Sequence, residues 1–81
     1  MPTWSKRAQR DLDALPDAMK ARARDLINRL DAEHGLGKKL VGPLQGIRSA
    51  RLGRSHRILY KINDDGTAHV LIIAQRRDAY R

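Results

Sequence analysis

The sequence has no cysteine and no phenylalanine, and Trp4, Tyr60 and Tyr80 are its only aromatic residues. Without cysteine, the chain has no disulfides, no thiolate metal ligands and no cysteine nucleophile. Because aromatic side chains are so few, we expect an aliphatic core of Leu, Ile, Val, Ala and Met. A chain of 81 residues without cross-links depends on close packing, or on a partner that covers exposed surface.

Long apolar stretches are also missing. The longest run, Val70 to Ala74, is much shorter than the roughly 18–20 residues that a membrane-spanning helix requires. The N-terminus does not show the pattern of a signal peptide. We therefore expect a cytoplasmic protein without a membrane partner, folded as one domain over residues 1–81.

Negative charge is absent from the middle of the chain. No Asp or Glu lies between Glu33 and Asp64, although the chain carries a net charge of +8. The basic residues of this stretch are Lys38, Lys39, Arg48, Arg51, Arg54, Arg57 and Lys61. Such an imbalance indicates a polyanionic partner, which can be a nucleic acid, an acidic protein or an anionic surface.

Two helices are expected in the first half of the chain. Apolar residues recur there at the spacing of one helical face, as Ala8, Leu12 and Leu15 and then Ala18, Met19, Ala23, Leu26, Ile27 and Leu30. Either Thr3 or Ser5 can cap the first helix, and Pro16 ends it. Asp17 begins the second helix, and Gly35 is placed to end it in a left-handed conformation.

The second half changes to the two-residue period of β-strands. Strands are predicted over residues 47–52, 56–62 and 67–74, after a loop at 40–46. Residues 53–55 form the first turn, and Asn63–Gly66 is a strong hairpin turn. The third strand is apolar from Val70 to Ile73, so we expect it at the centre of the sheet, buried on both faces. The order predicts an α+β fold, with an N-terminal α-hairpin packed on a small antiparallel sheet.

Common catalytic constellations are absent. His34, His56 and His69 are scattered and have no paired carboxylates near them, so we expect no metal and no cofactor. The glycines at Gly35 and Gly37 end a helix, whereas phosphate-binding loops begin one. Arginine remains the main candidate for chemistry.

An antiparallel meander would bring Arg51, Arg57 and Arg76 within reach of one another. The planar guanidinium suits a phosphate and the charge that develops on it during transfer. RNA cleavage needs no metal where an enzyme aligns the ribose 2′-hydroxyl with the adjacent phosphorus. Tyr80 can stack on a base or take part in proton transfer. His56 has an ordinary pKa near neutrality, but it can equally point away from the site.

Three stretches resemble the RelE/ParE superfamily of toxins. Residues 7–16 resemble the family's first helix with its closing leucine–proline pair. Residues 46–60 are similar to the basic strand–turn–strand of the RelE and YoeB branches. Residues 72–81 resemble the family's ending, where an arginine and a final tyrosine belong to the active site.

The resemblance implies a metal-independent endoribonuclease that cuts mRNA on the ribosome, in the A site beside ribosomal RNA. It also implies a cognate antitoxin that silences the toxin. Arg57 would stabilise the scissile phosphate, Arg76 would assist the leaving group or the phosphate, and Tyr80 would stack on the substrate or orient it. Arg51 lies where relatives keep a basic group for substrate binding or for the base. Further residues expected to bind substrate are Lys38, Lys39, Arg48, Arg54, His56 and Arg77.

The sequence departs from the family pattern at four places, and one of them is the turn Leu52 to His56, which is one residue longer than in the closest RelE-like pattern. Only Met1 to Trp4 precede the first helix, so the family's first strand is shortened or missing, which predicts an exposed sheet edge. Lys38 stands where YoeB-like members carry a glutamate, and Gln75 stands where a histidine is frequent. The general base is therefore not assigned.

Two other functions remain open from the sequence. A ParE-like toxin would inhibit DNA gyrase, and a basic RNA-binding module would bind without cleaving. The combination of Arg57, Arg76 and Tyr80 favours the nuclease.

Overall fold

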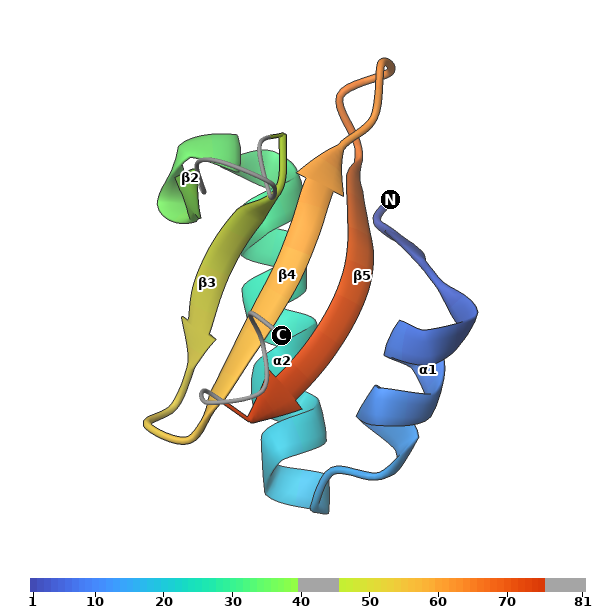
Figure 1. The fold of residues 1–81 in the computed structure, drawn as a ribbon, viewed down its shortest axis with the longest axis vertical. Helices are drawn as coiled ribbons and strands as arrows, with labels where there is room; N and C mark the ends of the chain where they lie inside the picture. The colour runs from blue at the N-terminus through green and yellow to red at the C-terminus, as the bar shows by residue number, and fades with distance from the viewer. Residues whose placement is uncertain (40–45, 76–81) are drawn as a thin grey trace.

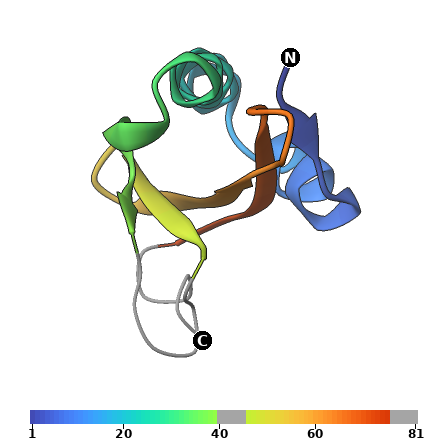
Figure 2. The same ribbon diagram turned by 90° about the horizontal axis from the view of Figure 1, so that it is seen from above.

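The computed structural model describes residues 1–39 and 46–75 and has two layers, with helices packed against one sheet (Figure 1). The elements are β1 (Thr3–Trp4), α1 (Lys6–Asp13), α2 (Asp17–Ala32), the 3-10 turn η1 (His34–Leu36), β2 (Lys38–Lys39), β3 (Arg48–Leu52), β4 (His56–Ile62) and β5 (Ala68–Gln75). Figure 2 shows the sheet curving around α2, with α1 beside its β1–β5 edge. The predicted α+β fold with a short first strand is confirmed.

The sheet is mixed, with the order β1-β5-β4-β3-β2. β1 runs parallel to β5, and the other neighbours are antiparallel. The expectation that the third predicted strand is central was wrong, because β4, the second predicted strand, pairs with both β3 and β5 and so lies in the middle of the sheet. Val70 and Ile73 are buried, but Leu71 and Ile72 are only half-buried. α2 covers the concave face of the sheet, and α1 packs against β5 at the edge. The β4–β5 register shifts at Leu59/Tyr60.

Ser5, and not Thr3, caps α1. Its hydroxyl oxygen accepts a hydrogen bond from the Ala8 amide at 2.9 Å and donates one to the Leu71 carbonyl at 2.7 Å. α2 starts directly after Pro16, as predicted. Gly35 does not take the predicted left-handed conformation. The chain instead continues through η1, which keeps it in right-handed geometry.

The edge of β5 beyond the short β1 strand is covered by side chains of the helical layer. Asp11 accepts a hydrogen bond from the Ile73 amide at 3.1 Å, and Asp31 accepts one from the Ala68 amide at 2.8 Å. The Ser5 amide donates to the Val70 carbonyl at 2.9 Å. The exposed edge expected from the shortened strand is therefore not found here, because helix carboxylates replace the missing strand.

Ser5→Ala should lower the free energy of unfolding by about 1–2 kcal/mol, because it removes the α1 cap and a bond to β5 together. Urea denaturation monitored by circular dichroism measures the loss. Ser55→Ala is the control, because Ser55 lies exposed in the β3–β4 turn, and it should change stability by less than about 0.5 kcal/mol. Equal losses in the two variants would contradict the capping role.

Candidate nucleic-acid interface

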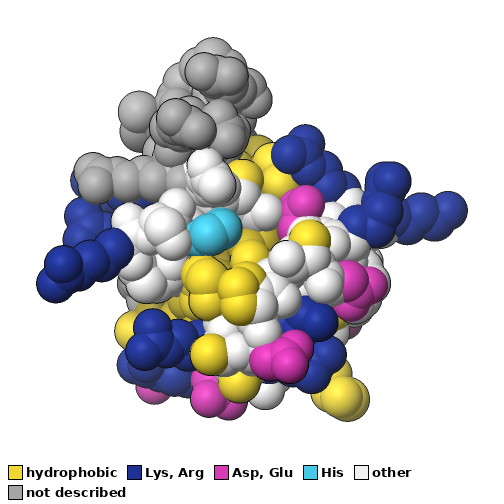
Figure 3. All heavy atoms as spheres, turned by 90° about the horizontal axis from the view of Figure 1, so that it is seen from below, with side chains coloured by type: hydrophobic (Ala, Val, Ile, Leu, Met, Phe, Trp, Pro, Cys, Tyr) yellow, Lys and Arg dark blue, Asp and Glu magenta, His cyan; other side chains and the backbone are white. Residues whose placement is uncertain are grey.

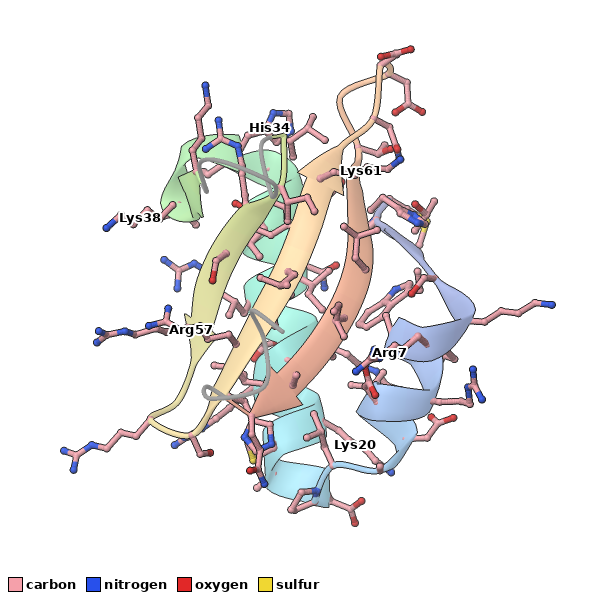
Figure 4. All side chains as sticks on the ribbon, in the orientation of Figure 1. Arg7, Lys20, His34, Lys38, Arg57 and Lys61 are labelled. Atoms are coloured by element: carbon pink, nitrogen blue, oxygen red, sulfur yellow. The ribbon has the colours of Figure 1, made fainter. Side chains whose placement is uncertain are left out.

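The face of the sheet that points away from the helices carries cations from three strands. On β4, Ile58 and Tyr60 belong to the core, so the alternating positions Arg57 and Lys61 lie on the opposite face. Cross-strand partners share a face, and the pairs Arg51↔Arg57 and Lys38↔Ser49 add two more cations. We call these residues, Lys38, Arg51, Arg57 and Lys61, the basic sheet face. Figure 4 labels Lys38, Arg57 and Lys61, which mark its extent from β2 to both ends of β4.

A pocket of about 200 Å³ lies where β3 turns into β4. It is lined by Arg51, Gly53, Arg54, His56 and Arg57. Gly53 has φ of +63°, which glycine adopts without strain, and this conformation allows the tight turn. The pocket therefore collects four of the residues that the sequence had assigned to the site.

Arg51 and Arg57 are directly opposite each other across the β3–β4 pair. Like charges in this position destabilise a sheet unless an anion lies between them. Arg57 is half-buried, and its Nε atom is buried, so its guanidinium is held close to the sheet. Two forked cations in this arrangement suit the oxygens of one phosphate group.

His56 and Arg54 complete the rim of the pocket. The Nδ1 atom of His56 lies 2.7 Å from the Ser55 hydroxyl, which ties the ring to the turn. Arg54 is exposed at the tip of this turn. Figure 3 looks onto this end of the molecule and shows basic side chains on the side of β3, with basic and acidic side chains mixed on the side of α1.

Arg48 lies apart from the pocket. It is half-buried opposite Tyr60, and its guanidinium donates a hydrogen bond to the Gly37 carbonyl at 3.3 Å. Lys39 pairs with Arg48 and so shares the helix-side face, whereas Lys38 lies on the basic sheet face. Arg76, Arg77 and Tyr80 lie outside the described residues, so their placement stays a prediction.

Tyr60 is a residue whose role the sequence did not indicate. Its side chain is fully buried, and its hydroxyl donates a hydrogen bond to the His34 carbonyl at 3.1 Å. Burial raises the pKa of Tyr60 above its ordinary value of 10.0, although Arg48 and the Gly37 backbone partly oppose this shift. In the sequence, Tyr60 is only an aromatic residue within a predicted strand, and this pattern is typical of any core position.

The free energy of unfolding should fall as the pH rises above about 10. The folded state holds the Tyr60 proton to a higher pH than the unfolded state, because its pKa is raised, so this contribution is complete below pH 10 and is lost above it. Urea titrations between pH 8 and 11.5 should show the stability advantage over Tyr60→Phe shrinking above pH 10. A constant difference between the two proteins would contradict this assignment.

Within residues 1–39 and 46–75, no three His, Asp or Glu side chains are grouped so that they could hold a metal ion. No helix in the same ranges is long and apolar enough to cross a membrane.

Comparison with known proteins places this geometry in a family. The family model described as "ParE toxin of type II toxin-antitoxin system, parDE" matches residues 3–80. Toxin RelE of Mycobacterium tuberculosis is 41% identical over 78 residues, which cover 91% of this chain and 78% of that protein.

Solved structures agree in fold. The toxin–antitoxin complex RelBE2 from M. tuberculosis superposes with a TM-score of 0.82 at 33% identity, covering 94% of this chain and 96% of that one. The YoeB/ParE toxin from Agrobacterium tumefaciens gives 0.81 at 25% identity, with 93% and 96% coverage. The sequence match and the shared fold together show that this chain belongs to the RelE/ParE superfamily of type II toxin–antitoxin toxins.

Proposed function

We propose that the chain is a single toxin domain, residues 1–81, that cleaves mRNA on the ribosome without a metal ion. The observation that carries the proposal is the direct opposition of Arg51 and Arg57 beside the pocket that Arg54 and His56 also line. A phosphate of the RNA backbone in this pocket would accept charge-assisted hydrogen bonds from both arginines.

The chemistry is attack of a ribose 2′-hydroxyl on the adjacent phosphorus, with release of the 5′-oxygen of the next nucleotide. Arg57 would stabilise the charge that grows on the phosphate oxygens, and Arg51 would bind the same phosphate from the facing strand. Arg76 would assist the leaving oxygen, and Tyr80 would stack on a base. The remaining cations of the basic sheet face, Lys38 and Lys61, would contact neighbouring phosphates and ribosomal RNA.

We also propose a cognate antitoxin of acidic character as the protein partner. The similar RelBE2 structure from M. tuberculosis is a toxin–antitoxin complex, and the basic sheet face offers a complementary surface. Co-expression with an acidic protein encoded next to the toxin should give a complex that survives gel filtration. Separate elution of the two proteins would overturn this pairing. Because ribosomes work in the cytoplasm, the proposed activity would take place there.

Inhibition of DNA gyrase is the second candidate, because the matching family model carries the ParE description. The two candidates separate when the purified protein is added to a translation reaction and to a gyrase supercoiling reaction. We expect loss of intact mRNA in the first and unchanged supercoiling in the second. The reverse pattern would replace the nuclease with the gyrase inhibitor.

A further inference from the structure

We infer that Arg48 is a positioning residue that sets Lys38 on the basic sheet face, and that it does not itself bind RNA. The inference rests on the proposed function, because Lys38 is taken as an RNA contact. The sequence assigned Arg48 to substrate binding on charge alone. In the structure, the Arg48 guanidinium donates a hydrogen bond to the backbone before β2.

The side chain of Arg48 is directed to the face that the helices cover. It is half-buried opposite the fully buried Tyr60, and its Nη1 atom donates a hydrogen bond to the Gly37 carbonyl at 3.3 Å. The phosphates of an RNA strand on the basic sheet face would lie on the other side of the sheet. Arg48 therefore holds the backbone that leads into β2.

Tyr60 contacts the segment from His34 to Gly37, which leads from α2 into β2. Its hydroxyl donates a hydrogen bond to the His34 carbonyl at 3.1 Å, and its ring packs against the buried Gly37. A Cβ atom on Gly37 would lie 2.6 Å from the Cε1 and Cζ atoms of Tyr60, so this position has no room for a side chain. η1 and the start of β2 therefore pack on Tyr60, and the hydrogen bond from Arg48 to Gly37 restrains their position.

Lys38 follows Gly37 directly and pairs with Ser49 on β3. β2 contains only Lys38 and Lys39, so strand pairing alone fixes it weakly. The Arg48–Gly37 hydrogen bond fixes the residue immediately before Lys38, and the alternation of the strand then directs Lys38 to the face of Arg51 and Arg57. Without this bond, the Lys38 ammonium loses its fixed place at the edge of the basic sheet face.

The test combines two measurements on the variants Arg48→Met, Lys38→Met and the double variant, with Arg22→Met on α2 as the control for charge. In the free protein, hydrogen exchange of residues 34–39 should rise about tenfold in Arg48→Met and stay unchanged in Lys38→Met. Exchange that is unchanged in Arg48→Met would overturn the positioning role, whatever the RNA results are.

The second measurement is the affinity for a fluorescein-labelled single-stranded RNA, by anisotropy over a range of salt concentrations. Arg48→Met and Lys38→Met should each weaken binding roughly two- to fivefold. Each should reduce the salt slope by about 0.7, and the double variant should lose no more than either single one. If the affinity losses of the two single variants multiply in the double variant, and its salt slope falls by about 1.4, then Arg48 itself contacts RNA and the inference is wrong. If the wild-type protein does not bind RNA, both the proposed function and the role of Lys38 as an RNA contact are wrong. The hydrogen-exchange result still decides whether Arg48 restrains β2.

Discussion

Arg57→Ala should lower the rate of mRNA cleavage by about 10²–10³-fold, the usual cost of removing one group that stabilises transition-state charge. Arg57 is the half-buried member of the arginine pair, and its position on β4 between β3 and β5 fixes it more firmly than an arginine on a turn. Arg57→Lys should recover only part of the rate, because an ammonium keeps the charge but loses the forked geometry.

The matched control for Arg57→Ala is Arg22→Ala, which removes the same side chain from the exposed surface of α2. The control should cleave within about twofold of wild type, and all three variants should retain the wild-type circular dichroism spectrum. Rates come from quantified RNA fragments in a reconstituted translation reaction. A folded Arg57→Ala protein that cleaves at the wild-type rate would remove Arg57 from the site.

Tyr60→Ala should lower the free energy of unfolding by about 3–5 kcal/mol, the range for truncating a large buried aromatic side chain. Tyr60 is fully buried on the central strand, packs in a cluster with Leu30, Ala50 and Ala68, and supports η1 through its hydroxyl. Since an average domain is stable by about 5–15 kcal/mol, this variant should be close to unfolding.

Tyr60→Phe separates the ring from the hydroxyl. It keeps the packed ring and removes only the hydrogen bond to the His34 carbonyl, so we expect a loss of about 0.5–1.5 kcal/mol. Urea denaturation measures both variants. Similar losses in the two would show that the hydroxyl, and not the buried ring, accounts for the role of Tyr60.

The helices, turns and strand boundaries could be predicted from local signals. The apolar spacing around Ala8 and Ile27, the proline at Pro16 and the turn at Asn63–Gly66 each act over a few residues, and the structure follows them. What could not be predicted depends on distant partners. The two-residue strands β1 and β2 exist only through pairing with β5 and β3, and a two-residue segment has no period to recognise.

The candidate site shows the same division. The two-residue period of a strand puts Arg48 and Arg51 on opposite faces of β3, and the register with β4 pairs them with Tyr60 and Arg57. The two-residue period of a strand does not show which face the helices cover. From the sequence, both arginines were therefore expected to contact the substrate. The carbonyl that Arg48 meets belongs to Gly37, eleven positions away, and neither residue carries a signal of that contact.

The most direct test of the account is a purified translation reaction in which the 5′ ends of an mRNA are mapped by primer extension, with and without ribosomes. We expect new ends within codons at the A site that require ribosomes and disappear with Arg57→Ala. Intact mRNA in the presence of folded wild-type protein and translating ribosomes would contradict the assignment of this toxin as an mRNA-cleaving enzyme.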